Sequence, residues 1–324
     1  MNQPPPLVVI LGPTASGKSA LAIEVARRWQ GEVVCCDSTQ LYRYFDIGTS
    51  KLRGPEQRGV PHHLMDLLEP AEIFTAGDYR RHALDVLADL RRRNRLPVLT
   101  AGTGLYLRAL LEGLADAPGR SEELRDRLRR RAKLRGAAHL YRILRRLDPP
   151  TAARIAPQDA AKLIRAIEVC LASGRPMSDV LRRPRPHLEG FQTLKIGLMP
   201  PRAALYERIE RRTRAMLAAG WLDEVRSLLA RGFDAQAKPF QFIGYGELRA
   251  HLAGVVDLET AVRAIQQATR RYAKRQITWF RRESGVDWFE GFGDQSATAE
   301  RVFALLARHL GPPAAGSGAA GGAL

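Results

Sequence analysis

Several kinds of feature are scarce in this sequence of 324 residues. It has three cysteines, none in a Cys-x-x-Cys pair or at the spacing of Cys/His metal ligands, which argues against a disulfide framework and a structural zinc site. No apolar run approaches the roughly 18 residues of a membrane span, and the run at residues 7–11 is too short for a secretory signal. These absences predict a cytoplasmic protein without a membrane segment.

Positive charge, in contrast, is abundant. The sequence has 51 Lys and Arg against 34 Asp and Glu, a formal net charge of +17. Residues 120–195 alone hold 19 basic and 8 acidic residues, so this segment carries +11 of the surplus. Such a concentration is typical of a surface that binds a polyanion, usually RNA or DNA. The alternative is an arginine-rich composition that only decorates solvated helices.

The order of the apolar segments predicts an α/β fold. Short apolar runs that indicate buried strands alternate with glycine turns and amphipathic helical patterns. The expected strands are residues 7–11, 33–36, 96–100 and 194–198, and the expected helices are residues 19–30, 78–93, 202–219, 222–231, 258–282 and one that starts at Leu105. Recurrence of strand, glycine turn and helix is the signature of a parallel sheet flanked by helices.

The basic segment differs from its surroundings because its pattern is helical throughout and is interrupted only by prolines and glycines. We therefore expect an α/β catalytic core formed by residues 1–119 and 190–310, with an all-helical insertion at residues 120–189. Residues 311–324 are mostly Gly, Ala and Pro, a composition that predicts a disordered tail.

One octapeptide carries a strong chemical signal. It lies between the first expected strand and helix, fits the phosphate-loop pattern G-x-x-x-x-G-K-[ST], and consists of Gly12, Pro13, Thr14, Ala15, Ser16, Gly17, Lys18 and Ser19. The backbone N–H groups of such a loop, with the lysine ammonium, bind a diphosphate or triphosphate, and the Ser19 hydroxyl can ligate Mg²⁺. The motif leaves open which phosphate compound binds and whether a P–O or a C–O bond breaks.

Two polar positions follow other expected strands. We interpret Asp37 as the end of the strand next to the phosphate loop, and Thr103 lies in a glycine turn after residues 96–100. Ligands of open parallel sheets bind at the carboxyl ends of the strands, so all three features should meet in one crevice. Taken alone, Asp37 could be a turn cap and Thr103 a helix N-cap.

Seven motifs in one order resemble those of the tRNA dimethylallyltransferase (IPP transferase) family. Besides the phosphate loop, they are DSTQLYRYFDIGTSK at residues 37–51, PHHLMD at 61–66, AGTGLYLRALLEGL at 101–114, KLIRAIEVCLASGRPMS at 162–178, FIGYGEL at 242–248 and ATRRYAKRQITWFR at 268–281. The resemblance implies a P-loop NTPase-like core with its helical insertion. The lack of a zinc-finger pattern points to the bacterial form of the family, and a monomer is the default expectation.

The reaction that this resemblance implies is transfer of a dimethylallyl group from dimethylallyl diphosphate to the exocyclic N6 of an adenosine. That adenosine is next to the anticodon of tRNAs that read codons beginning with U. The expected cofactor is Mg²⁺, and the expected second product is pyrophosphate. The resemblance implies that Asp37 is the general base, that Thr103 hydrogen-bonds near the phosphate or target base, and that Arg208 and Arg212 reach the pyrophosphate. A solvated arginine face would give the same i, i+4 spacing of the two arginines.

A larger set is implied to contact the tRNA. It comprises Asp37, Ser38, Thr39, Gln40 and Thr103 around the target nucleotide, Arg125, then Ala161, Lys162, Leu163, Ile164 and Arg165, and finally Gln241, Phe242, Ile243, Gly244, Tyr245 and Gly246. Ala101 and Gly246 depart from the residues that are usual in the family.

Two other functions stay open on the sequence alone. A small-molecule or nucleoside kinase would use ATP at the same loop, and an RNA-binding regulator would use a nucleotide only as a switch. We interpret the adjacent His62 and His63 as structural rather than as a metal pair. Tyr272, Gln276 and Trp279 share one face of the last long helix, which favours core packing.

Overall fold

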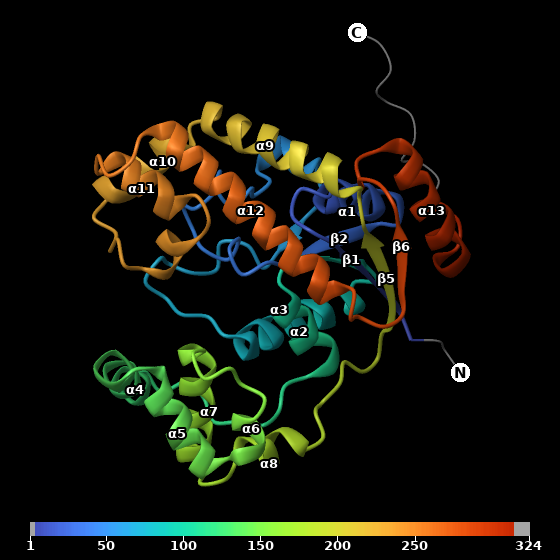
Figure 1. Cartoon of the computed structure of the whole chain (residues 1–324). Coiled ribbons are helices and arrows are strands. Elements are labelled where there is room, and N and C mark those ends of the chain that lie inside the picture. Colours follow the sequence, from blue (N-terminus) through green and yellow to red (C-terminus); the bar gives the residue numbers. More distant parts are fainter. Residues whose placement is uncertain (1–3, 314–324) are drawn as a thin grey trace. The chain divides into compact units, whose positions relative to one another are not determined.

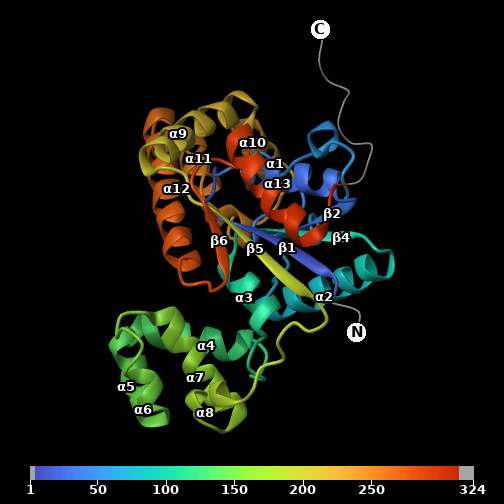
Figure 2. The same ribbon diagram turned by 90° about the vertical axis from the view of Figure 1, so that its right-hand side faces the viewer.

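The computed structural model describes residues 4–313, and Figures 1 and 2 show it from two sides. The described chain divides into two compact units, one from residues up to Leu110 together with those from Glu189 onward, the other Leu111–Leu188. The elements, in chain order, are β1 (Pro6–Leu11), α1 (Lys18–Arg28), β2 (Gly31–Cys36), η1 (Gly54–Gln57), β3 (His62–His63), α2 (Ala76–Arg92), β4 (Leu96–Ala101), α3 (Gly104–Glu112), α4 (Glu122–Arg135), α5 (Ala137–Leu147), α6 (Pro149–Ala152), α7 (Ala160–Ser173), α8 (Met177–Arg182), β5 (Gln192–Leu198), α9 (Arg202–Ala218), α10 (Trp221–Ala230), η2 (Lys238–Gln241), α11 (Tyr245–Leu252), α12 (Leu258–Phe280), β6 (Val286–Phe289) and α13 (Ser296–Leu310).

The described strands of the larger unit form one parallel sheet in the order β3-β2-β4-β1-β5-β6, which confirms the expected fold class. The strand before Asp37 is not next to the strand before the phosphate loop, as the sequence analysis supposed, because β4 pairs between them. Leu11, Ala101 and Cys36 lie in one row of the register. The three chain segments that follow this row therefore leave the same edge of the sheet side by side.

Helices cover both faces of this sheet, and its central strands are therefore buried on both sides. Val8 and Ile10 of β1 pack against α1 and α13 through residues such as Leu21 and Val302. On the opposite face lies α2, whose Tyr79 hydroxyl donates a hydrogen bond of 3.2 Å to the Cys35 carbonyl. Continuous apolar strands of this kind are characteristic of parallel sheets. Next to the sheet, the long α12 packs along α9, as Figure 1 shows.

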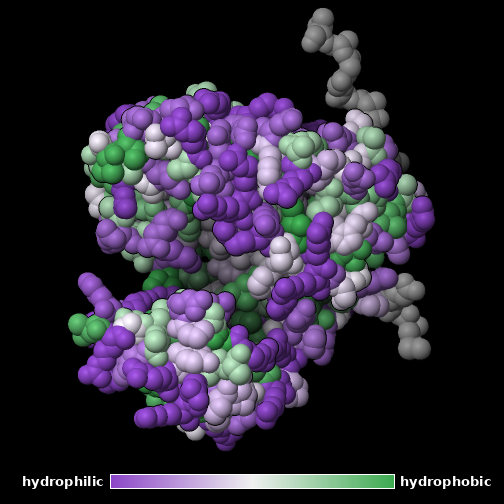
Figure 3. Space-filling view, in the orientation of Figure 1, coloured by the Kyte–Doolittle hydropathy of each residue, from purple (hydrophilic) through white to green (hydrophobic). Residues whose placement is uncertain are grey.

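The smaller unit contains helices α4 to α8 around its own apolar core. Leu128, Leu140, Leu144, Leu163 and Ile167 are buried in it. The outer positions of α4 are strongly basic, and hydrophilic side chains gather over this helix in Figure 3. The exposed cationic residues of α4 are Arg127, Arg129, Arg130, Arg131, Lys133 and Arg135.

Several elements were not predicted from the sequence. Among them are the two-residue β3, the edge strand β6, and helices α11 and α13. The expected disordered tail falls outside the described residues from residue 314 on, whereas the Gly311 carbonyl accepts a hydrogen bond from the Trp29 indole at 3.0 Å. Across residues 4–313, no helix is both long and apolar enough to cross a membrane.

Candidate active site

The phosphate loop joins β1 to α1 in a conformation that needs its two glycines. Gly12 and Gly17 have φ angles of 149° and 85°, which side chains rarely adopt. A Cβ at Gly12 would lie 2.7 Å from the Leu198 carbonyl oxygen. Helix α1 begins at Lys18, so the unpaired N–H groups of its first turn face the loop. The loop is therefore shaped for an anion by local sequence and by the close approach of β5.

Cationic side chains line the pocket beside this loop. Lys18 donates to the Pro13 carbonyl at 2.8 Å. Desolvation lowers the pKa of Lys18 to about 8; the nearby Asp37 carboxylate opposes this and the Arg212 guanidinium adds to it. Burial also lowers the pKa of Arg212, and Arg208 lowers it further. An anion bound here would relieve this repulsion among cations, so the pocket favours a negatively charged ligand.

The ends of β1, β4 and β2 border one pocket of ≈ 580 Å³, whose lining includes residues 14–19 of the phosphate loop, Asp37 and Gly102 but not Thr103. Asp37 follows β2, and the Gly102–Thr103 turn follows β4. The N–H groups of Gly102 and Thr103 both donate to the Cys36 carbonyl, at 3.0 and 2.9 Å. The Thr103 hydroxyl oxygen accepts from the Ser38 N–H at 2.9 Å. These bonds fix Asp37 and Thr103 relative to each other.

Asp37 is held by only one of its carboxylate oxygens. Its Oδ1 accepts hydrogen bonds from the Thr39 N–H at 2.9 Å and from the Thr39 hydroxyl at 2.7 Å. Its Oδ2 lies so close to Gly102 that a Cβ on that glycine would overlap it. Within residues 4–313, this second oxygen accepts no hydrogen bond. A half-buried carboxylate oxygen is thus free to accept a proton or a hydrogen bond from a substrate.

Gln40, expected at the target base, uses its side chain inside the protein. Its Nε2 donates to the Thr49 carbonyl at 3.0 Å, and its Oε1 accepts from the Cys35 thiol at 3.0 Å. Ser38 and Thr39 likewise line the pocket. Gln40 therefore ties the end of β2 to the segment at residues 48–50, which forms one wall of the pocket.

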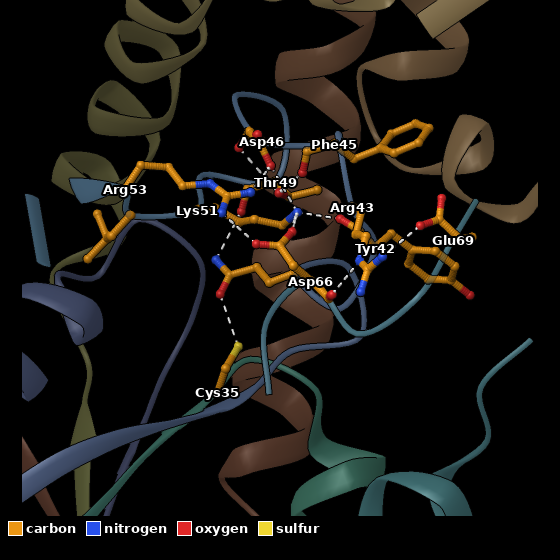
Figure 4. Close-up of polar contacts among 12 residues, drawn as sticks. Cys35, Tyr42, Arg43, Phe45, Asp46, Thr49, Lys51, Arg53, Asp66 and Glu69 are labelled. Atoms are coloured by element: carbon orange, nitrogen blue, oxygen red, sulfur yellow. Dashed lines mark hydrogen bonds and ion pairs between the residues drawn. The ribbon is translucent and has the colours of Figure 1, made fainter. Parts of the chain in front are cut away.

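A buried lysine next to residues 48–50 anchors this segment to its neighbours, as Figure 4 shows. The Lys51 side chain is fully buried, and its ammonium lies 2.9 Å from Asp46 Oδ1 and 2.6 Å from Asp66 Oδ1. It also donates to the Tyr42 carbonyl. Arg53 bridges the same two aspartates from the outside. This network links both ends of the segment 42–66 to its middle, and the middle includes residues 48–50, which line the pocket.

Arg208 and Arg212 of α9 both line the pocket. Arg208 forms a two-pronged ion pair with Asp294, with 2.8 Å between Nη1 and Oδ1, and stacks over the Phe292 ring at 4.6 Å. Arg212 is half-buried and forms no ion pair with any residue in the described range 4–313. An unpaired guanidinium at this depth is a suitable partner for an anion.

Sequence reasoning missed three pocket residues. Tyr272 and Arg275 come from α12, and Asp294 follows β6. The Tyr272 hydroxyl donates to the Gly102 carbonyl at 3.3 Å, and burial raises the pKa of that hydroxyl. The signal was present, because these α12 residues share one helical face. The helical period does not reveal that the face covers a site instead of core. The same pocket has an apolar side formed by Ile209, Met216, Trp221, Ile243 and Ile265.

The segment expected to contact RNA at residues 241–246 is partly internal. Gln241, Phe242 and Ile243 line the pocket. Tyr245, in contrast, is fully buried and donates to Glu224 at 2.6 Å. A Cβ at Gly244 would overlap the Trp221 ring. A Cβ at Gly246 would lie 3.4 Å from the Phe240 carbonyl oxygen, an ordinary van der Waals contact.

In the helical unit, a buried carboxylate holds two of the expected tRNA contacts. Glu168 accepts from Arg125 through Nε and Nη2, both at 2.8 Å, and from Arg165 at 2.6 Å. Burial alone would raise the pKa of Glu168, but hydrogen bonds from the two arginines outweigh it and lower that pKa to about 2. Of the stretch from Ala161 to Arg165, Leu163 and Ile164 are buried, while Lys162 is exposed and pairs with Asp159.

The residues at the loop fit a metal ion that is held mainly by its substrate. No group of three or more His, Cys, Asp and Glu side chains suited to a metal occurs in the described part of the chain. Ser19 lies exposed in the first turn of α1 and lines the pocket. The Ser16 hydroxyl is buried in the loop without a hydrogen-bond partner among residues 4–313. In phosphate loops of this pattern, the serine or threonine hydroxyl ligates Mg²⁺ next to the bound phosphates.

Comparisons with known proteins agree on one family. A family model described as IPP transferase matches residues 40–283, beginning after the phosphate loop. The tRNA dimethylallyltransferase of Solibacter usitatus is 50% identical over 306 residues, which is 94% of this chain and 99% of that relative. The tRNA dimethylallyltransferase of Koribacter versatilis is 52% identical over 302 residues, 93% of this chain and 98% of that relative.

Solved structures extend the match to the fold. The tRNA isopentenylpyrophosphate transferase of Bacillus halodurans superposes with a TM-score of 0.69 at 36% identity, over 94% of this chain and 96% of that one. A eukaryotic dimethylallyltransferase acting on tRNA superposes with a TM-score of 0.81 at 25% identity, over 96% and 81%. The resemblance carried by the seven motifs is thereby confirmed, and this chain belongs to the IPP transferase family.

Proposed function

We propose that this protein is a transferase that moves a dimethylallyl group from dimethylallyl diphosphate to N6 of the adenosine next to the anticodon of a tRNA. The observation that carries this is the pairing of two functions in one pocket. The phosphate loop, Lys18 and the unpaired Arg212 line the same pocket as Asp37, whose Oδ2 accepts no hydrogen bond from residues 4–313. A kinase can use the same two features. The apolar side of the pocket, which suits a five-carbon group, and membership of the IPP transferase family favour prenyl transfer.

The loop and its cations serve the leaving group. As the C–O bond of the allylic diphosphate breaks, its electron pair moves to the bridging oxygen, and negative charge grows on the pyrophosphate. Loop N–H groups, Lys18 and Arg212 stabilise that charge. Arg208, now paired with Asp294, is within the same pocket and completes the cationic side. Mg²⁺ held by Ser19 would supply further charge to the departing oxygens.

Asp37 serves the nucleophile. The adenine N6 lone pair forms the new C–N bond, and the amine must lose a proton, which Asp37 Oδ2 accepts. A positioned base contributes about 10²–10⁴-fold to such a step. Thr103 keeps the Asp37–Ser38 turn in place, and the apolar side of the pocket, with Met216 and Trp221, suits the five-carbon group. The base must leave its stack to reach this pocket.

The tRNA itself requires a basic surface. The helical unit offers the exposed cations of α4, together with Arg125 and Arg165, to the phosphate backbone. We assign the protein to the cytoplasm, where the three free cysteines stay reduced. We also propose a monomer, since one chain supplies every side chain used in these steps.

Mass spectrometry of the tRNA tests the proposal. The protein is incubated with Mg²⁺, dimethylallyl diphosphate and an unmodified tRNA that has adenosine next to its anticodon. We expect the mass of one five-carbon prenyl unit on the tRNA and release of pyrophosphate. Unchanged tRNA at saturating substrate contradicts the function. Phosphate transfer from ATP to a product would favour a kinase.

The base assignment has its own test. Asp37→Asn should lower kcat by about 10²-fold or more, since the amide cannot accept the proton. Asp85→Asn changes an exposed aspartate of α2 and is the matched control. Equal kcat in these two variants contradicts the role of Asp37.

A further inference from the structure

One buried side-chain amide joins two parts of the active site that are remote in sequence. Gln276 of α12 is only 6% exposed. Its Oε1 accepts a hydrogen bond from the Thr14 N–H at 2.7 Å, and its Nε2 donates to the Gly102 carbonyl at 2.8 Å. These contacts span 262 and 174 residues of chain. A primary amide presents an acceptor and a donor at once, which both partners require.

Both partners of Gln276 belong to groups that the reaction uses. Thr14 lies in the phosphate loop, and its N–H donates its hydrogen bond to Gln276. Gly102 packs against Asp37 Oδ2, and its own N–H donates to the Cys36 carbonyl at 3.0 Å. The amide is therefore the direct link between the segment that binds the leaving group and the turn that holds the base.

We propose that Gln276 is a positioning residue that sets the distance between the diphosphate and Asp37. This inference rests on the proposed function, because it concerns the alignment of amine, allylic carbon and leaving oxygen. An error of about 1 Å in such an alignment costs on the order of 10²-fold in rate. The Tyr272 hydroxyl also donates to the Gly102 carbonyl, but at 3.3 Å and without contacting the loop, so it does not replace the bridge.

Gln276→Leu removes both hydrogen bonds while keeping a side chain of similar volume. The matched control is Gln266→Leu, which changes another buried glutamine of α12 whose Nε2 makes one long hydrogen bond of 3.5 Å to the Glu210 carbonyl. We expect kcat at saturating substrates to fall about 10²-fold in Gln276→Leu and to stay within about two-fold in the control. The dissociation constant for tRNA should be alike in the two variants, whereas the melting temperature should be lower in Gln276→Leu, which leaves the Thr14 N–H without its partner.

A second variant separates positioning from simple support of the fold. In Gln276→Glu, the new carboxylate still accepts from Thr14 but repels the Gly102 carbonyl. Protonating that carboxyl group at lower pH restores a donor, so the ratio of the variant's kcat to that of the wild type should rise as pH falls. Gln276→Leu should show no such rise. A merely structural role predicts a constant ratio in both variants.

The outcomes are decisive in each case. A kcat loss in Gln276→Leu no larger than in the control, or a flat ratio for Gln276→Glu, overturns the inference; the second criterion applies even where the leucine variant fails to fold. Failure of the proposed function looks different, because the wild-type protein would then leave the tRNA mass unchanged. In that event the inference falls with it.

Discussion

Among residues 4–313, Glu168 is the one carboxylate that pairs with Arg125 and Arg165, and replacing it by glutamine would remove that carboxylate. The Glu168 side chain is fully buried and accepts hydrogen bonds from both guanidinium groups and from the Ser121 N–H at 2.8 Å. Its pKa falls from 4.5 to about 2. At about 1.4 kcal/mol per pKa unit, that shift corresponds to about 3 kcal/mol of folding free energy. Breaking a buried ion pair typically costs about 3–5 kcal/mol, which agrees.

We therefore expect Glu168→Gln to lower the free energy of unfolding by about 3 kcal/mol at pH 7. The folded-state pKa lies below the unfolded-state value, so this contribution is fully present above pH 4.5 and is lost as pH falls towards 2. The difference between variant and wild type should shrink over the same window. Urea unfolding followed by circular dichroism at several pH values measures it.

Binding of tRNA gives an independent readout. Without the carboxylate, Arg125 and Arg165 are no longer fixed, so tRNA affinity should fall. The slope of log affinity against log salt concentration should become shallower by about the equivalent of one or two phosphate contacts. Glu123→Gln removes an exposed carboxylate of α4 and is the control, with an expected stability change within about 0.5 kcal/mol. A loss below about 1 kcal/mol for Glu168→Gln, or a loss unchanged at acidic pH, would refute the reasoning.

Three further predictions concern the larger unit. The ratio kcat/KM for dimethylallyl diphosphate should decline above pH about 8, because the free enzyme then loses the Lys18 proton; an inflection that survives unchanged in Lys18→Arg contradicts this. Gly102→Ala should lower kcat by about 10²-fold, since its Cβ would overlap Asp37, whereas Gly119→Ala, with nothing near its Cβ, should not; equal rates would show that the overlap is relieved elsewhere. Lys51→Met should destabilise the protein by about 3 kcal/mol in urea unfolding, because two aspartates lose their buried partner; a change under about 1 kcal/mol would mean that Arg53 suffices.

Local features were predictable because each depends on neighbouring residues. The phosphate loop needs two glycines, a lysine and a serine at fixed spacing between a strand and a helix, and all of these are adjacent in sequence. The motifs at residues 37–51 and 101–114 were recognisable for the same reason. Their meeting in one pocket followed from a general property of parallel sheets, whose strand ends share an edge.

Strand order was not predictable, since pairing is long-range. Nothing near Asp37 shows that β4 lies between its strand and that of the phosphate loop. Short edge elements such as β6 were missed because four residues carry too little pattern. The ion pair of Arg208 with Asp294 likewise joins segments more than 80 residues apart, so the sequence near Arg208 and Arg212 does not show which of the two arginines lacks an ion-pair partner.

Helix α12 shows most clearly which properties the sequence determined and which the tertiary structure decided. Its sequence determined a long amphipathic helix with Tyr272, Gln276 and Trp279 on one face. Only the tertiary structure decided that the buried part of this face contacts a phosphate loop 262 residues away, so that Gln276 is a link within the site instead of core filling. Helical periodicity reports that a face is covered, but the covering segment is chosen by packing over the whole chain.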